Sequence, residues 1–334
     1  MQLPVMSDAD IDVATVKPWI GPVGQRMERL ELHLTYTCPE RCGFCSEDHR
    51  MKRYRQFPVT FGRVATVLRM HAERGVRNIH LTGGEPTIFP RFVDVLRLAH
   101  KLRMRTSVGT IGTRLADRAF ATEAMPYLDE GLFSLHGPDA QLHDRMAGRP
   151  GSFEQVTRAI TLCRELRPDF GAYVNTVVTR DNVGVLGDTV ALAGKLGAKL
   201  IVISNVTPEG LGLDRYEELA VPLAELGEVL PTVPSRAPDS IVRFFGTPMC
   251  LLGPHRMLSN DLHWDPRVTV EWQDAPGKVS YAGIYSWAPD RKRVHAPECE
   301  RCADNEVCMG VFDRYVALFP TDALRPREVE EGPP

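Results

Sequence analysis

Short apolar runs alternate with longer segments of helical period from about residue 29 to residue 205 of this 334-residue chain. The short runs have the length of buried strands, and the longer ones carry apolar residues three and four positions apart. Such alternation predicts β/α units around a parallel sheet. Six strands are expected, at residues 30–36, 78–82, 106–110, 132–135, 172–178 and 199–205. Six consecutive units predict an α/β fold of the partial (β/α)6, TIM-like barrel type.

The regular alternation weakens after Pro208. A helix is expected over residues 216–230, followed by the proline-rich linker "PTVPSRAPDS" and by two strands within residues 267–286 that turn at residues 274–277. Residues 296–310 are rich in cysteine and lack a regular period, so a metal would have to replace the missing core there. We therefore expect an extension over residues 1–28, a barrel over 29–230, and a small auxiliary domain with a β-hairpin over 231–334.

Composition narrows the functional classes. The chain has 43% hydrophobic and 25% charged residues and a formal net charge of −3, which is typical of a soluble globular protein and gives no reason to expect nucleic acid as a partner. Its first thirty residues contain no apolar run long enough for a signal peptide or a membrane span, so we expect a cytoplasmic protein. Thiols stay reduced in that compartment, and the eight cysteines are expected to be metal ligands or core residues.

Three cysteines follow the first expected strand, in the stretch "LTYTCPERCGFCSEDHR". They would leave the carboxyl end of the sheet, where barrel active sites lie. The spacing C-x3-C-x2-C lets three thiolates bind one small inorganic group and is one ligand short of a closed zinc site. An iron-sulfur cluster held in this way keeps one iron open to an outside ligand. The alternatives are a zinc loop with a fourth ligand such as His49, or simple core cysteines. The three residues are Cys38, Cys42 and Cys45.

The cysteine pattern, with Phe44 before its last member, resembles the signature of the radical S-adenosylmethionine (radical SAM) superfamily. In that superfamily the second strand ends in a Gly-Gly-Glu-Pro motif that contacts the methionyl amine, and "LTGGEP" stands at the end of the second expected strand here. Glycines let backbone carbonyls approach an ammonium group, and a carboxylate adds a charge-assisted hydrogen bond. Taken alone, the motif could be a plain turn. The resemblance implies a 4Fe-4S cluster on the three cysteines and S-adenosylmethionine bound at Gly83, Gly84, Glu85 and Pro86.

The same resemblance extends to four polar residues, although each could instead be a helix cap or a turn former. Ser134 and Arg145, in "FSLHGPDAQLHDRMAGRPGSF", match residues that hold the carboxylate of the cofactor in family members with extra clusters. Thr110 is the candidate for the ribose, in a place where the family more often has asparagine. Asn175 is the candidate for the methionine end.

A second cysteine group resembles the auxiliary-cluster domain of radical SAM enzymes, of the SPASM type or its shorter twitch form. SPASM domains generally use about seven cysteines for two clusters, whereas four are left for the purpose here, because Cys163 lies on the apolar stripe of an expected helix. The resemblance therefore implies one further 4Fe-4S cluster. Two alternatives stay open: a structural zinc, or Cys250 as a catalytic thiol that donates hydrogen to a substrate radical. The group consists of Cys250, Cys299, Cys302 and Cys308.

The resemblance also implies a reaction. S-adenosylmethionine bound to the open iron would be cleaved by an electron from a reducing partner such as flavodoxin or ferredoxin. The resulting 5′-deoxyadenosyl radical would abstract hydrogen from a substrate in the barrel mouth.

Two substrate classes are considered. The preferred one is a small natural-product intermediate (a sugar, a nucleoside or an aminoglycoside-like metabolite) undergoing epimerisation, dehydrogenation or rearrangement. The alternative is a ribosomally made peptide. Many peptide maturases carry an added leader-binding domain, whereas only about 28 residues precede the first strand here, which favours the small molecule. A non-enzymatic electron carrier or cluster scaffold is the alternative of another class.

Overall fold

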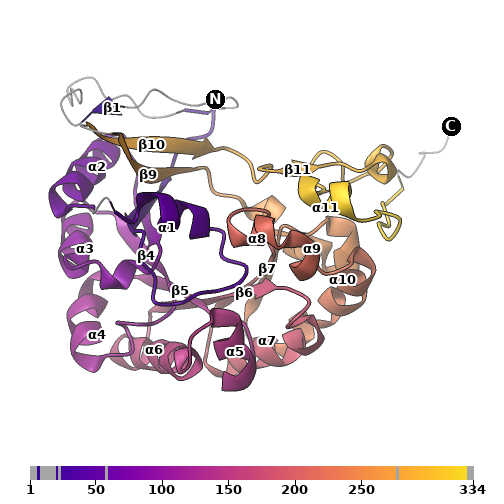
Figure 1. Ribbon diagram of the computed structural model, residues 1–334, viewed down its shortest axis with the longest axis horizontal. Coiled ribbons are helices and arrows are strands. Elements are labelled where there is room, and N and C mark those ends of the chain that lie inside the picture. The colour runs from indigo at the N-terminus through magenta and orange to yellow at the C-terminus, as the bar shows by residue number, and fades with distance from the viewer. Residues whose placement is uncertain (1–5, 8–19, 22–23, 57–58, 276–277, 329–334) are drawn as a thin grey trace.

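The computed structural model describes residues 6–7, 20–21, 24–56, 59–275 and 278–328. Its main sheet has ten strands in the order β1-β10-β9-β2-β3-β4-β5-β6-β7-β8. The sheet curves into an open barrel ringed by helices (Figure 1). The strands are β1 Met6–Ser7, β2 Arg29–Thr35, β3 Asn78–Gly83, β4 Arg105–Thr110, β5 Glu130–Ser134, β6 Gly171–Val178, β7 Leu200–Asn205, β8 Ile241–Phe245, β9 Arg267–Ala275 and β10 Lys278–Ser286.

The partial barrel predicted from the sequence is confirmed. All six expected strands form, as β2 to β7, and neighbouring ones pair in parallel. The parallel set is longer than expected, because β8 pairs with β7 and β9 pairs with β2, where Arg29 lies opposite Arg267. The expected hairpin forms from β9 and β10 and joins the main sheet, while residues 276–277 of its turn lie outside the described residues. The sheet thus continues beyond residue 230, and the proposed division of the chain into domains stays a prediction.

Helices connect the parallel strands and cover the outside of the barrel (Figure 1). The helix expected over residues 216–230 is broken: α9 ends at Leu219 and α10 begins at Leu223, because Pro222 has no N–H to donate and disfavours helical geometry at Val221. Within the described residues, no helix has both the length and the apolar character needed to span a bilayer. The helices are α1 Asp48–Tyr54, α2 Phe61–Glu73, α3 Phe92–Lys101, α4 Arg118–Ala124, α5 Ala140–Ala147, α6 Ser152–Leu166, α7 Leu186–Lys195, α8 Leu211–Asp214, α9 Tyr216–Leu219, α10 Leu223–Val229 and α11 Asp313–Leu318.

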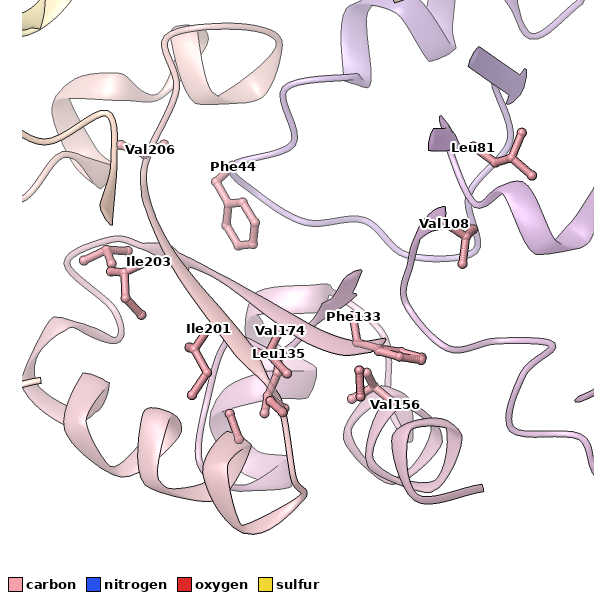
Figure 2. Close-up of a cluster of buried hydrophobic side chains, with 14 of the residues drawn as sticks. Phe44, Leu81, Val108, Phe133, Leu135, Val156, Val174, Ile201, Ile203 and Val206 are labelled. Atoms are coloured by element: carbon pink, nitrogen blue, oxygen red, sulfur yellow. The ribbon is translucent and has the colours of Figure 1, made fainter. Parts of the chain in front are cut away.

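The hydrophobic core fills the space between the outer face of the strands and the helices. In Figure 2, Phe133 of β5 lies close to Val156 of α6, and Val174 and Ile201 of the next two strands belong to the same cluster. Cys163 of the same helix is fully buried in this core, as its place on an apolar stripe predicts. Alternate strand residues face inward, so the sheet presents polar side chains to the interior of the barrel.

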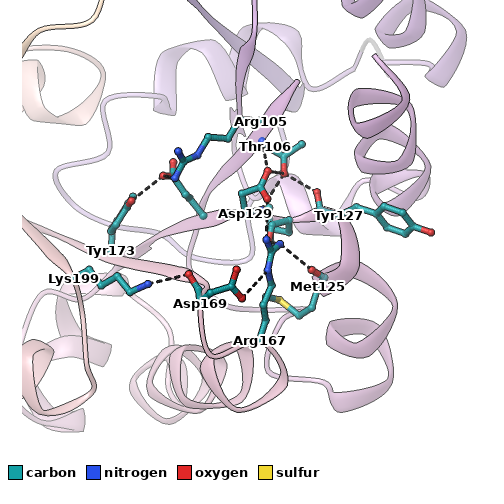
Figure 3. Close-up of polar contacts among 11 residues, drawn as sticks. Arg105, Thr106, Met125, Tyr127, Asp129, Arg167, Asp169, Tyr173 and Lys199 are labelled. Atoms are coloured by element: carbon teal, nitrogen blue, oxygen red, sulfur yellow. Dashed lines mark hydrogen bonds and ion pairs between the residues drawn. The ribbon is translucent and has the colours of Figure 1, made fainter. Parts of the chain in front are cut away.

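A polar network fastens the amino-terminal ends of the central strands (Figure 3). The carboxylate of Asp129 accepts hydrogen bonds from the backbone N–H of Thr106 (2.9 Å) and from the guanidinium of Arg167 (3.1 Å). Arg167 also donates to the carbonyl of Leu128 (2.9 Å). These contacts join loops before β4, β5 and β6. The opposite, carboxyl ends of the strands carry the cysteine loop described next.

Candidate metal centres and active-site cavity

The first cysteine loop connects β2 to α1 and is tied to two distant parts of the barrel. The backbone N–H of Arg41 donates to the carbonyl of Ala147 at the end of α5 (2.8 Å), and the N–H of Leu211 donates to the carbonyl of the last cysteine (2.9 Å). Phe44 packs edge-on against His136, with ring centroids 4.9 Å apart. These contacts fix the loop, and the structure brings together three electrostatically interacting thiols, those of Cys38, Cys42 and Cys45.

The surroundings of these thiols favour the neutral form unless a cation is present. Burial raises the pKa of Cys38 to about 12 and that of Cys45 to about 11, and it raises the pKa of Cys42 as well. The carboxylates of Glu40 and Glu85 add to the effect at Cys38. A metal group supplies the positive charge that such buried thiolates need, so the donor set fits a metal centre.

The two glycines of the "GGEP" motif allow its backbone to run directly beside the chain that leads into the cysteine loop. Gly84 donates to the carbonyl of Thr35 (2.7 Å), and Glu85 donates to that of Thr37 (2.8 Å). A Cβ on Gly83 or Gly84 would lie 2.3 Å from one of these same carbonyl oxygens, and Gly83 has a φ of +125°. Any larger residue would therefore push the cysteine loop away. The sequence interpretation missed this role.

The carboxylate of Glu85 is fully buried and bonded to protein groups. It accepts hydrogen bonds from the Thr110 hydroxyl (2.8 Å), from the backbone N–H of Ile111 (2.8 Å) and from the Thr87 hydroxyl. The Thr110 hydroxyl also accepts from the N–H of Gly112 (2.9 Å). Both side chains thus link the end of β3 to the end of β4, and their contacts with S-adenosylmethionine stay predictions. Pro86 begins the short 3-10 helix Pro86–Ile88.

A cavity of about 1270 Å³ occupies the inside of the barrel. It reaches the first cysteine loop at Ser46, the residue after the last cysteine. Side chains from β2 through β10 line it, so it extends through the barrel between the strand ends. Its volume exceeds the range of roughly 300–1,000 Å³ that is common for small-molecule sites.

The second cysteine group forms a compact site near the carboxyl end of the chain. The four thiols surround a cavity of about 20 Å³, and they interact electrostatically with one another. Burial raises the pKa of Cys250 to about 11, and the other three thiols raise it further. Cys250 lines this small cavity and not the large one in the barrel. The structure therefore brings together all four residues that the sequence grouped: Cys250, Cys299, Cys302 and Cys308.

Backbone N–H groups contact the sulfur of Cys308, and a buried ion pair fixes the loop that carries it. Cys308 Sγ accepts the N–H groups of Met249 and Gly310, both at 3.4 Å. Arg293 donates to the carbonyl of Gly310 (2.6 Å) and pairs with Asp261 (3.1 Å), with both charged side chains at most 1% exposed. This buried pair fixes the loop that carries Cys308. N–H groups that point at sulfur are the surroundings that cluster thiolates receive in iron-sulfur proteins.

Comparison with known proteins gives the relationship. Residues 32–193 match the radical SAM superfamily, the stretch that contains the cysteine loop, the "GGEP" motif and five of the parallel strands. This part of the chain is a radical SAM domain. Members of this superfamily bind a 4Fe-4S cluster and S-adenosylmethionine, which agrees with the three-thiol loop at the carboxyl end of β2.

Several of the similar proteins have names or titles that mention a peptide. The PqqA peptide cyclase of Rhodopseudomonas palustris is 30% identical over 202 residues, which are 60% of this chain and 53% of the relative. The chain spans about half the length of the curated relatives it matches. Streptococcus suis SuiB bound to its precursor peptide SuiA has a TM-score of 0.57 and 15% identity, covering 73% of this chain and 57% of that chain. The protein anSMEcpe with bound AdoMet and a peptide has a TM-score of 0.58 and 16% identity, covering 90% and 93%.

These comparisons contradict the expectation of a small-molecule substrate. The preference for a sugar, nucleoside or aminoglycoside-like compound was wrong, because the PqqA relatives are named as peptide cyclases. The two structural neighbours, which show the shared fold, were determined with peptides bound. The argument from the short segment before the first strand did not hold, because relatives that match this chain are named as peptide cyclases.

The remaining predicted radical SAM residues are only partly brought together. Ser134 at the end of β5 lies opposite Asn175 of β6, and Asn175 Oδ1 accepts a hydrogen bond from Ser204 (2.6 Å). Arg145 is exposed on α5. Its contact with the cofactor stays a prediction. Arg149 lies near the first cysteine site, where it lowers the pKa of Glu40 against the larger effect of burial, which raises it to about 7. In the sequence, Glu40 stands between two of the cysteines, and this buried carboxylate was the signal that a cation should lie near it.

Arg50 of α1 connects the radical SAM cysteine loop to other parts of the chain, a role with no clear signal in the sequence. Its guanidinium lies 2.7 Å from the carboxylate of Glu271 on β9, 3.3 Å from that of Glu209 after β7 and 3.2 Å from that of Glu47. Three carboxylates around one cation form a network that resists solvent better than an isolated surface pair. Arg50 therefore holds the cysteine loop, the hairpin and the loop after β7 in one arrangement.

Proposed function

We propose that this chain is a radical SAM enzyme that modifies a peptide. The observation that carries the proposal is the large barrel cavity, which meets the three-thiol loop at Ser46. A substrate in this cavity would lie next to the group bound by the three cysteines. The cavity also has room for an extended peptide segment beside a cofactor, whereas a closed pocket of ordinary small-molecule size does not. The 30% identity to a PqqA peptide cyclase supports the substrate class.

The first site is proposed to hold a 4Fe-4S cluster through Cys38, Cys42 and Cys45, with S-adenosylmethionine beside it. When bound, the two groups supply a 5′-deoxyadenosyl radical. The contribution of the chain is positional: the glycine pair sets the distance between two loops, and the strands enclose the cavity. The electron is expected to come from a small reducing protein.

The second site is proposed to hold a further 4Fe-4S cluster through four thiolates, with Cys250 as a ligand. Its place among the other three thiols, away from the barrel cavity, supports a ligand over a hydrogen donor. Among the described residues, no three or more His, Cys, Asp or Glu side chains converge closely enough to hold a single metal ion. A cluster is proposed over a single zinc because the four cysteines resemble the auxiliary-cluster domain of radical SAM enzymes.

One experiment tests the proposed function. The anaerobically reconstituted protein is incubated with dithionite, S-adenosylmethionine and the peptides encoded by genes next to its own, and 5′-deoxyadenosine and peptide mass are followed together. The proposal predicts 5′-deoxyadenosine and a matching mass change in one peptide. The Cys42→Ala protein serves as the control and should yield neither. Intact clusters without any 5′-deoxyadenosine would refute the enzyme, and 5′-deoxyadenosine with no peptide modified would refute the substrate class.

A further inference from the structure

Arg243 differs from the other arginines that line the barrel cavity. Arg29 and Arg267 both pair with Glu31, at 3.7 and 2.8 Å, and Arg291 pairs with Glu209 at 3.1 Å. Within the described part of the chain, Arg243 has no carboxylate at ion-pair distance, and its guanidinium donates only to the carbonyl of its own neighbour Val242 (3.2 Å). Lys199, the one lysine in the lining, also has no such partner among the described residues, but it is exposed and donates to the carbonyl of Asp169 (2.9 Å), whereas Arg243 is partly buried.

Glu31 and Glu130, two of the carboxylates that line the same cavity, are already engaged. Glu31 accepts hydrogen bonds from Arg267 (2.8 Å) and Thr269 (3.1 Å), and Glu130 accepts one from Tyr173 (2.8 Å). Partial burial lowers the pKa of Arg243, and no carboxylate opposes that shift. A partly desolvated guanidinium with no counter-ion favours an anion from outside the chain, above all a carboxylate that it can bind with two hydrogen bonds.

The register of the sheet places Arg243 at the height of the predicted cofactor residues. Ser134 lies opposite Asn175, Asn175 opposite Val202, and Val202 opposite Arg243, in one row across β5, β6, β7 and β8. Neighbouring strands are about 4.8 Å apart, so two strand spacings, about 10 Å, separate Asn175 from Arg243. An anion at Arg243 would thus hold a molecule about 10 Å from the predicted cofactor residue Asn175.

An aromatic wall lies directly beside this cation. Phe245 is two residues farther along β8, on the same inward face, and it stacks on Trp264 with centroids 6.4 Å apart and planes 19° apart. Both rings line the cavity. The site therefore pairs one cation with apolar surface, which suits a carboxylate borne on an organic chain better than a small inorganic anion.

We propose that Arg243 is a substrate-binding residue that holds a carboxylate of the peptide in the barrel cavity. The inference rests on the proposed function and deepens it by naming a feature of the substrate. The carboxylate comes either from an Asp or Glu side chain or from the carboxyl terminus of the peptide.

The test measures binding and needs no turnover. The full-length, anaerobically reconstituted protein is equilibrated with a library of N-acetylated synthetic heptapeptides, randomised at five positions, with the carboxyl terminus either amidated or free. Bound peptides are identified by mass spectrometry. We expect about tenfold enrichment of acidic over amide side chains in the amidated arm, or of free over amidated termini, and the arm that shows it identifies the source.

Two variants and a control complete the test. Arg243→Gln should abolish the enrichment, Arg243→Lys should retain part of it, and Arg118→Gln, which removes an exposed cation from α4, should leave it unchanged. Iron content and the thermal midpoint report whether each variant is folded. Peptide binding without any preference for carboxylates, or a preference that persists in Arg243→Gln, would overturn this inference and leave the proposed function standing. Failure of every peptide to bind would overturn the peptide substrate and the inference together.

Discussion

The two cysteine sites share their ligand chemistry but differ in access. The first has three thiols on a loop that meets a cavity of about 1270 Å³, whereas the second has four thiols around a cavity of about 20 Å³. The first loop is held by backbone contacts with the end of α5 and the start of α8, and the second is braced by the buried Asp261–Arg293 pair. In the proposed assignment, the first site is open to a further ligand, and at the second the protein supplies every ligand.

The largest effect is expected from Cys42→Ala, which should empty the first site alone. Iron should fall from about eight to about four atoms per chain, and 5′-deoxyadenosine formation should fall to background, because two thiolates do not hold the open cluster. Iron analysis and product assay check this. Cys163→Ala, in the core of α6, is the matched control and should keep all its iron while losing about 1 kcal/mol of unfolding free energy. Full iron content and turnover in Cys42→Ala would show that the first site is not a cluster.

Cys250→Ala should empty the second site and leave the first intact. We expect about four iron atoms per chain, loss of peptide modification, and cleavage of S-adenosylmethionine within about threefold of the wild-type rate, since the cavity does not reach Cys250. Iron content and both products are measured in parallel. If the variant kept about eight iron atoms and lost only turnover, Cys250 would be a hydrogen donor instead.

Arg293→Met should destabilise the second site through the charge that it leaves behind. Asp261 would stay buried without its counter-ion, at a cost of about 3–5 kcal/mol in unfolding free energy. Denaturant unfolding measures the loss. The double variant Arg293→Met, Asp261→Leu should recover much of it. Arg118→Gln, which breaks an exposed pair with Glu165, should cost at most about 1 kcal/mol. An equal loss of unfolding free energy in Arg293→Met and in Arg118→Gln would contradict the role of the Asp261–Arg293 pair in bracing the second site.

Acid should act on the first site through two buried histidines, whereas His295, which lines the second cavity, is exposed. Burial lowers the pKa of His136 to about 3 and that of His143 to about 4, and both rings accept backbone N–H bonds at Nδ1. Their folded pKa values lie below the unfolded value of about 6.5, so their stabilising effect is complete above pH 7 and declines below pH 6.5, by about 2 kcal/mol each at pH 5. Unfolding free energies at pH 7.5 and 5.5 test this. His143→Gln should reduce the difference between them, and an unchanged difference would contradict it.

The smallest effect is expected from Thr110→Val, which removes a hydroxyl and keeps the shape of the side chain. Because this hydroxyl bonds Glu85 and Gly112, we expect a loss of about 1–2 kcal/mol in unfolding free energy. The KM for S-adenosylmethionine should change by less than about threefold. A change in KM well above this limit, without loss of stability, would show that Thr110 binds the ribose.

The sequence predicted the barrel because strand and helix periods are local properties. Leu30, Leu32 and Leu34 alternate with polar residues over the whole of β2, and that pattern survives folding. The strand β8 was missed because its five residues follow a stretch with three prolines. The pairing of β9 with β2 joins residues more than 230 positions apart, and nothing local in the sequence records it.

The candidate sites were predictable where spacing carries the chemistry. Short intervals keep the sulfurs of Cys38, Cys42 and Cys45 near one another, and those of Cys299, Cys302 and Cys308 likewise, whereas Cys250 reaches the second group through the fold. Partners set by tertiary contact were not predictable. The hydroxyl of Thr110 bonds Glu85 from another strand, and Arg149 lies near Glu40 through the end of α5. Arg243 was not predicted, because its proposed role depends on having no carboxylate at ion-pair distance among the described residues. A sequence alone does not show that property.

The difference between an open and a closed cysteine site can be measured directly. The reduced, reconstituted protein is examined by electron paramagnetic resonance with and without S-adenosylmethionine, alongside Cys42→Ala and Cys250→Ala. We predict that S-adenosylmethionine changes one of two cluster signals in the wild type, changes the signal that remains in Cys250→Ala, and leaves that of Cys42→Ala unaltered. Unaltered wild-type signals, or a change that persists in Cys42→Ala, would contradict the assignment of the open site to the loop after β2.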